Sequence, residues 1–124
     1  MPFVTAIANA ILNCYLRNTA ITPPTATYIS LHTADPGDTG TSEVTGGSYA
    51  RVAATFGSAA AAKAIASTTD VLFTGMPAVT VTYVGIWSAV SGGTFIWGGA
   101  ITSKTFTAGD SFDFAIGQIS AALT

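Results

Sequence analysis

The chain has 124 residues and a net charge of −2, and only 8% of its residues are charged, whereas ordinary soluble domains contain about 25%. Its four basic residues are scattered, so it lacks the clustered Lys and Arg that nucleic-acid binding requires. The length predicts a single domain, residues 1–124. Because few charges oppose association, we expect this domain to form a homo-oligomer or to pack against other proteins.

The first predicted element is a helix over Phe3–Arg17, within residues 1–18. Its polar side chains recur every four residues and leave a wide apolar sector that contains Ile7 and Ile11. A helix with so wide an apolar sector is usually buried on more than one side. We expect it to dock on the protein's own sheet or, for part of its face, on another subunit, with Ile7 and Ile11 as candidate contacts.

The same segment bears on localisation. Its apolar run, from Phe3 to Leu16, is too short to span a bilayer and lacks the basic start of a secretory signal. We therefore expect no membrane partner, and synthesis in a cytoplasm.

After Pro23 and Pro24, which end any helix, the hydrophobic period becomes two. Tyr28–Thr33 alternates polar and apolar residues, which predicts a half-buried strand, and the long loop Ala34–Ser48 follows it. The Ala-rich stretch Ser58–Ala62 could form one helical turn. Further strands are predicted at Tyr49–Phe56, Val71–Thr74, Val79–Trp87, Thr94–Gly98, Ile101–Phe106 and Ser111–Leu123.

The last of these strands changes phase along its length. Phe112, Phe114 and Ile116 share one parity, whereas Ile119, Ala121 and Leu123 share the other. Because side-chain direction in a strand has a period of two, one extra residue must be absorbed, and we predict a β-bulge at Gly117–Gln118.

Many short strands separated by turns, after a single helix, indicate a mainly β fold. We predict an antiparallel β-sandwich, jelly-roll-like, over residues 26–124, with one N-terminal α-helix. The chain has no repeat of fixed period, which argues against the shaft of a fibre.

The chain offers few residues for catalysis. His32 is the only histidine, with Ser30 predicted on the same face of its strand, and Cys14 lies on the apolar side of the helix. Neither residue sits in a recognisable nucleophile motif, so we expect no enzyme activity and no cofactor. Trp87, Trp97 and Tyr83 could line a glycan groove, although aromatic residues at strand spacing are more often core residues. We predict no catalytic residue in this chain.

The loop over residues 34–48 concentrates polar residues. Its acids Asp35, Asp38 and Glu43 raise the question of calcium, but their spacing is not that of an EF-hand. Asp-Pro-Gly-Asp is better explained as turn chemistry, so we predict no metal site. We expect the loop to be an extended, ordered connector that reaches a neighbouring subunit, with Arg51 forming an exposed ion pair with Glu43 or an Asp. The candidate partner contacts in this region are Asp35, Pro36, Gly37, Asp38, Glu43 and Arg51.

Four stretches carry a resemblance: "AIANAILNCYL", "YISLHTADPGDTG…EVTGGSYARVAATFG", "VTYVGIWSAVSGG" and "AGDSFDFAIGQISAALT". With them the chain resembles, over nearly its whole length, a family of small virion proteins of tailed bacteriophages that are described as tail fibre or minor tail proteins. The resemblance implies a non-enzymatic structural component of the virion, with other virion proteins as partners. It carries no catalytic residue over to this sequence.

Because a fibre shaft would need length and repeats, the sequence favours a compact cement or decoration subunit bound to the major capsid protein. A tail fibre or minor tail component is the alternative, and a host-glycan binding module is a third hypothesis.

Overall fold

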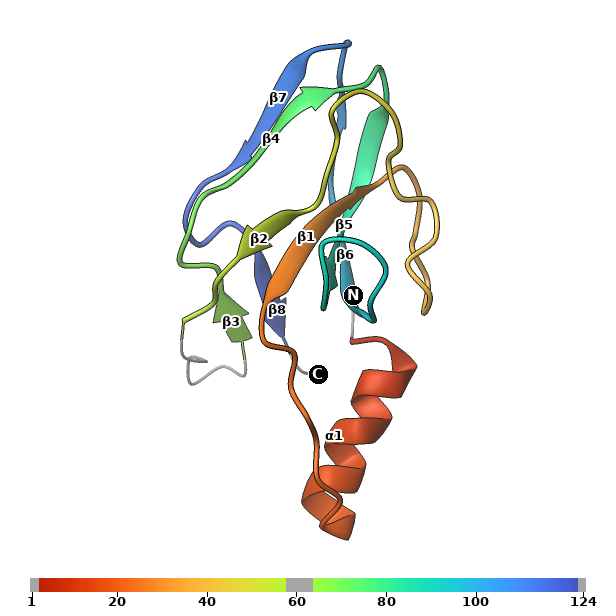
Figure 1. Ribbon diagram of the computed structural model, residues 1–124, viewed down its shortest axis with the longest axis vertical. Coiled ribbons are helices and arrows are strands. Elements are labelled where there is room, and N and C mark those ends of the chain that lie inside the picture. Colours follow the sequence, from red (N-terminus) through yellow and green to blue (C-terminus); the bar gives the residue numbers. More distant parts are fainter. Residues whose placement is uncertain (1–2, 58–63, 123–124) are drawn as a thin grey trace.

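The computed structural model describes residues 3–57 and 64–122, and it contains one helix followed by eight strands (Figure 1). The helix is α1 (Thr5–Arg17). The strands are β1 (Thr27–His32), β2 (Val52–Ala54), β3 (Ala64–Ala66), β4 (Val71–Met76), β5 (Thr80–Trp87), β6 (Phe95–Thr105), β7 (Asp110–Phe114) and β8 (Ser120–Ala122).

The strands form an antiparallel β-sandwich, as predicted. A four-stranded sheet has the order β2-β1-β5-β6, and the two ladders β3-β8 and β4-β7 provide the remaining pairs. Every pair of these strands is antiparallel. Apolar side chains from the four-stranded sheet and from the ladders form one core, which includes Ile29, Leu31, Phe73, Met76, Val81 and Phe106.

β1 is more deeply buried than its alternating sequence predicts. Ser30 and His32 are as inaccessible as Ile29 and Leu31, with exposed fractions of 0%. Both edges of β1 are paired, one with β2 and the other with β5. The loop after it folds back: Val44 extends the pairing along one edge by donating a backbone hydrogen bond to Leu31, and the Thr41 carbonyl meets the His32 ring on the second face. The prediction of a half-buried strand was therefore wrong.

α1 begins at Thr5, and it is attached to the sandwich only near its start. Val4 is buried against Trp87 and Phe95, and its amide donates to the Ile96 carbonyl over 3.0 Å. None of the 13 residues of α1 is buried, and Figure 1 shows the helix projecting beyond the strands. The prediction that α1 docks on the protein's own sheet was therefore wrong. In the described part of the chain, no helix is long and apolar enough to cross a membrane.

The return from α1 runs back beside it. Asn18 adopts the left-handed conformation that commonly ends a helix, with φ of 54°. Exposed residues 18–26 then lead to β1 alongside the helix (Figure 1). We call α1 together with this returning segment the stalk, because it extends from one end of the sandwich.

Several predicted strand bounds change in the structure. The two strands expected at Thr94–Gly98 and Ile101–Phe106 form the single strand β6, and the strand expected from Tyr49 is ordered as β2 only over Val52–Ala54. β3 was not anticipated, because Ala64–Ala66 has little sequence contrast. The helical turn considered for Ser58–Ala62, and Leu123, lie outside the described residues.

The phase change after Phe114 is real, but it is not a bulge. β7 ends there, and the amide of Gln118 bonds to the Ala115 carbonyl to close a turn in which Gly117 has φ of +84°. β8 then pairs with β3, whereas β7 pairs with β4. A turn between two ladders resets side-chain parity just as an inserted residue would, which is why parity alone could not distinguish them.

Candidate functional site

The loop over residues 34–48 packs onto its own domain. Pro36 is fully buried, and Gly40 has φ of +75°, with the rings of Trp87 and Phe95 against it. The later part of the loop is held to β1, because Glu43 forms an isolated backbone bridge with His32. The loop is therefore ordered, as predicted, but the expectation that it is extended was wrong, because it turns at Pro36 and packs against its own domain.

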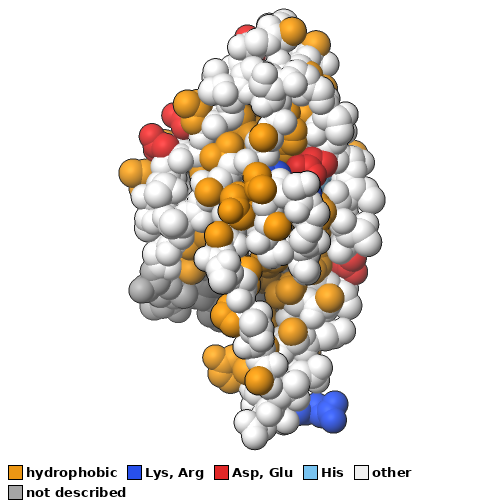
Figure 2. Space-filling model, viewed as in Figure 1, with side chains coloured by type: hydrophobic (Ala, Val, Ile, Leu, Met, Phe, Trp, Pro, Cys, Tyr) orange, Lys and Arg blue, Asp and Glu red, His pale blue; other side chains and the backbone are white. Residues whose placement is uncertain are grey.

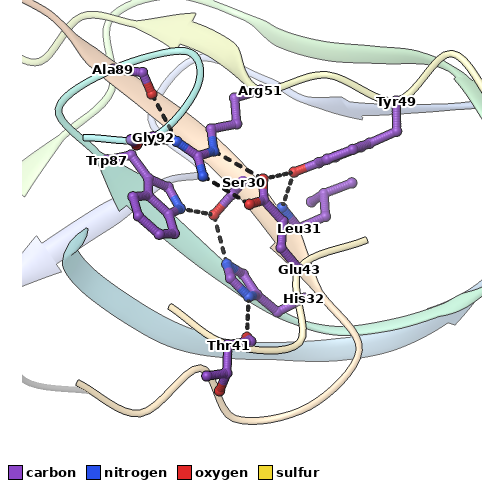
Figure 3. A network of polar contacts seen from close by, with 10 residues as sticks. All are labelled: Ser30, Leu31, His32, Thr41, Glu43, Tyr49, Arg51, Trp87, Ala89 and Gly92. Atoms are coloured by element: carbon purple, nitrogen blue, oxygen red, sulfur yellow. Dashed lines mark hydrogen bonds and ion pairs between the residues drawn. The ribbon is translucent and has the colours of Figure 1, made fainter. Parts of the chain in front are cut away.

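Glu43 and Arg51 form the centre of a polar network between this loop and the start of β2 (Figure 3). The Arg51 guanidinium donates from Nε and Nη2 to the two carboxylate oxygens of Glu43, each over 2.9 Å. Their side chains are only 9% and 21% exposed. The predicted pairing of Arg51 with Glu43 is confirmed, but the expectation that it is exposed was wrong, because the pair lies between the loop and the turn that connects β5 to β6.

The same guanidinium connects the loop to the hairpin between β5 and β6. Arg51 Nη1 donates to the carbonyls of Ala89 over 3.0 Å and Gly92 over 2.8 Å. Its central carbon lies 3.7 Å from the centre of the Trp87 ring, which is close enough for a cation–π contact. One side chain thus joins the carboxylate, two turn carbonyls and an aromatic face, a set that the planar fork of Arg suits and Lys does not.

Tyr49 completes the carboxylate's environment. Its hydroxyl donates to Glu43 over 2.8 Å and accepts the Leu31 amide over 3.0 Å. Burial raises the pKa of the Tyr49 hydroxyl far above its usual value, so it remains a donor. Burial also acts to raise the pKa of Glu43, but hydrogen bonds from Arg51 and Tyr49, with the charge of Arg51, outweigh it and leave that pKa below 4.5. Glu43 is therefore ionised at neutral pH.

A second, buried chain of hydrogen bonds contains the only histidine (Figure 3). His32 Nδ1 lies 2.8 Å from the Thr41 carbonyl, which can only accept, so this nitrogen carries the proton. Nε2 then accepts from the Ser30 hydroxyl over 2.7 Å, and Ser30 in turn accepts from the Trp87 indole N–H over 3.0 Å. Burial lowers the pKa of His32 below 6.5, consistent with a neutral ring.

Ser30 and His32 therefore do lie side by side, but in a place that no substrate reaches. Both are 0% exposed, and Gly85 of the neighbouring strand packs directly over them. Cys14 belongs to α1, which projects away from this region. The arrangement holds the loop to the sheet, and the sequence pattern could not show it because the burial comes from the folded loop.

The three loop acids point to three different partners. Asp35 accepts the Gly37 amide over 2.9 Å, as expected of a turn. Asp38 accepts the Thr5 amide over 3.1 Å and the Thr5 hydroxyl over 2.7 Å, which lowers its pKa. Since Glu43 binds Arg51, the acids do not converge. Across residues 3–57 and 64–122, no group of three or more His, Cys, Asp or Glu is placed to hold a metal ion.

The Asp38 contact is a helix cap that the sequence analysis missed. Thr5 begins α1, where backbone amides lack partners within the helix, and a carboxylate there satisfies one of them. The capping residue lies 33 positions further along the chain, so no local motif could predict it. The loop thereby orients the base of the stalk.

The two Trp residues considered for glycan binding belong to the core. Trp87 is 8% exposed and Trp97 is 7% exposed, while Tyr83 is half-buried. The indole N–H of Trp87 donates to Ser30, and the ring lies against the Arg51 guanidinium. The hypothesis of an aromatic platform on these residues was therefore wrong.

The stalk carries the exposed apolar surface that the composition predicts. Leu12, Tyr15 and Leu16 are 55%, 83% and 78% exposed. These three residues, which we call the tip ridge, lie on one side of α1 because they are three or four positions apart. In the view of Figure 2, hydrophobic side chains lie on the part of the molecule that projects beyond the sandwich, with few charges around them.

Ile7 and Ile11, the predicted contacts on the helix, are half-buried at the base of the stalk. They line an apolar groove of about 420 Å³ between α1, the returning segment and the start of β6, together with Ile21, Pro23 and Ile96. We call it the root groove. Solitary exposed apolar residues are ordinary, but a contiguous ridge and groove on a projecting element usually mark an interaction surface.

A comparison with protein families identifies the chain's relatives. The family model described as podophage GP4 fiber I protein gp80 matches residues 2–122. The chain belongs to the gp80 fibre family. This confirms the resemblance found in the sequence and makes the chain a bacteriophage structural protein of the virion. The gp80 description of a fibre agrees better with the tail-fibre alternative than with capsid decoration. The sequence matches no curated protein.

Proposed function

We propose that the chain is a non-enzymatic subunit of a virion tail fibre, which is incorporated through the apolar surface of its stalk. The exposed tip ridge is the observation that supports this most directly. Burying a large apolar side chain is worth about 1.5–3 kcal/mol relative to leaving it exposed. Leaving three of them exposed therefore costs stability that a partner would restore.

The sandwich and its loop supply rigidity in this proposal. Glu43 and Arg51 lock the loop, and Asp38 of the same loop caps α1, so the stalk has a defined direction. Pro36, in the same loop, is fully buried and packs inside the domain. Contact of a neighbour with the exposed residues Asp35 and Gly37 stays a prediction.

The position in the virion distinguishes this proposal from capsid cement, which the sequence analysis ranked first. The fibre description of the family supports the tail, although the chain is compact and without repeats. Quantifying the protein in purified virions tests the choice. A few copies to a few dozen per particle are expected, and hundreds of copies would return the proposal to capsid decoration.

The stalk's role is tested by incorporation. Leu16→Ser removes part of the tip ridge, and Ile116→Ser removes a side chain that is 66% exposed on the sandwich. Both variants should fold, since neither side chain is buried. Virions complemented with Leu16→Ser should contain much less of the protein than virions complemented with Ile116→Ser. Equal incorporation would refute assembly through the stalk.

A further inference from the structure

Resting on the proposed function, in which the stalk attaches the subunit, we infer that protonation of His32 turns the rigid attachment of the stalk into a hinge. The stalk then has one direction at neutral pH and many in mild acid. The loop over residues 34–48 connects the histidine to the stalk, because it covers the first and caps the second.

The histidine belongs to a small buried layer on the outer face of the four-stranded sheet. Ser30 and His32 alternate along β1 with residues of the main core, so they point to the opposite face. On that face the rings of His32 and Phe95 make an edge-type contact with their centres 5.8 Å apart, and Trp87 lies 5.0 Å from Phe95. Gly40 of the loop packs against both Trp87 and Phe95. The loop therefore forms the lid of this layer.

The stalk is attached to the same layer and to its lid. Val4, just before α1, is buried against Trp87 and Phe95. Thr5 donates its amide and its hydroxyl to Asp38 of the loop, over 3.1 Å and 2.7 Å. If the loop moves away from the layer, the cap is lost and the packing around Val4 opens with it. The bond from the Val4 amide to β6 then remains as the pivot.

The hydrogen bonds of His32 fit only the neutral ring (Figure 3). Nδ1 donates to the Thr41 carbonyl of the loop, and Nε2 accepts from Ser30, which itself accepts from Trp87. A proton on Nε2 would face the Ser30 hydroxyl and deprive its hydrogen of that acceptor. The new charge would also be buried, since His32 is 0% exposed, and a buried charge is costly unless it is paired. Opening the loop admits water to the ring, so the charged ring favours the open form.

The charges that face His32 do not remove this penalty. Burial is the largest effect and lowers the pKa of His32. The loop carbonyl at Nδ1 and the charge of Glu43 raise that pKa, whereas the charge of Arg51 lowers it. From β5 and β6, Gly85 and Phe95 face the ring, and neither carries a charge. Because Glu43 is already paired with Arg51, its carboxylate is not free to neutralise a charged imidazole.

His32 is also the group of this region that changes its charge in mild acid. An unperturbed imidazole titrates near 6.5. The pKa of Glu43 lies below 4.5 and that of Asp38 below 3.8, so both remain ionised above pH 5. Arg51 keeps its proton throughout. A response between pH 7.5 and 5 is therefore assigned to the histidine, whereas a response below pH 4 would belong to Asp38.

The sign of the effect follows from linkage. In the open form the ring is in water and has its ordinary pKa, whereas in the closed form the pKa is lower. The ratio of open to closed molecules rises as the pH falls below 6.5, by up to about tenfold per pH unit, until the folded pKa is reached. Opening one loop requires less free energy than unfolding the sandwich. The stalk should therefore loosen before the strands unfold.

Distances between two spin labels test the hinge. One label is placed on Cys14, the only cysteine, which lies in α1, and the other on Ile116→Cys, at a side chain of the sandwich that is 66% exposed. The distance distribution should be narrow at pH 7.5 and broad at pH 5, while the far-ultraviolet circular dichroism of the strands stays unchanged. Equally narrow distributions would overturn the inference. Loss of the strand signal at the same pH would overturn it too, because the histidine would then act on the whole fold.

Three variants assign the response. His32→Gln has a neutral side chain, so its distribution should be the same at both pH values; the wild-type broadening in this variant would refute the role of the histidine. Asp38→Ala removes the cap and should broaden the distribution already at pH 7.5, whereas Asp35→Ala alters only a turn and should not. Asp38 is exposed, so its variant stays informative if His32→Gln does not fold. Equal widths for the two Asp variants would show that the loop does not hold the stalk.

The proposed function is separable from the hinge, because incorporation of Leu16→Ser is measured at neutral pH. If the stalk stays rigid at pH 5 and Leu16→Ser still fails to enter virions, the hinge is refuted and the proposed function stands. If the stalk loosens at pH 5 and Leu16→Ser enters virions normally, the hinge stands and the proposed function is refuted.

Discussion

Replacing Gly40 with Ala tests whether the loop is part of the fold. Gly40 has φ of +75°, and a Cβ there would overlap the indole ring of Trp87. Gly37, three residues earlier, provides a matched control, because it has φ of +60° but nothing within 4 Å of a Cβ. Both substitutions force Ala into the left-handed region, and only one also meets a packed ring.

The structure sets the expected difference. Left-handed backbone costs a residue other than Gly about 1–2 kcal/mol, and this applies to both variants. Overpacking a well-packed site adds about 1–3 kcal/mol, because Trp87 is held by Ser30 and Arg51 and cannot easily move. Gly37→Ala should therefore lose about 1–2 kcal/mol of unfolding free energy, and Gly40→Ala about 2–5 kcal/mol.

Urea unfolding of the wild type and both variants measures these values, with equal slopes required for the comparison. The loss of near-ultraviolet signal from Trp87 should be larger in Gly40→Ala. If the two variants lose the same free energy, the loop does not pack against Trp87 as described, and the account of its order is wrong.

Arg51→Lys keeps the charge but loses the paired bonds to Glu43 and the turn carbonyls, so urea unfolding should show a loss of about 1–3 kcal/mol; no change would mean that the network contributes nothing. Because the folded pKa of His32 lies below 6.5, the unfolded chain binds the extra proton, and stability should be full above pH 6.5 and fall as the pH is lowered towards the folded pKa. Urea midpoints between pH 7.5 and 5 should show this slope, and His32→Gln should flatten it; an equal slope in the variant would assign the effect to other groups. Asp38→Ala should lower the helical circular dichroism of α1 relative to Asp35→Ala, which alters only a turn, and equal spectra would exclude the cap.

Local chemistry along the chain determined much of this protein. The four-residue polar spacing of Asn9 and Asn13 predicts α1, and period-two alternation predicts the strong strand β5. The Asp-Pro-Gly turn at Asp35 also follows from its own residues, because Asp bonds a backbone amide two positions on. These features depend on neighbours within a few residues, which the sequence displays directly.

Tertiary structure decided the features that depend on distant residues. Ser30 and His32 alternate like residues of a half-exposed strand, but the loop that covers them makes them fully buried. Asp38 caps a helix 33 positions away. The far part of the apolar sector of α1, at Leu12, Tyr15 and Leu16, stays exposed because the helix leaves the sandwich after its anchor at Val4. A hydrophobic pattern records which side chains favour burial, but only the packed chain determines which of them its own atoms cover and which remain for a partner.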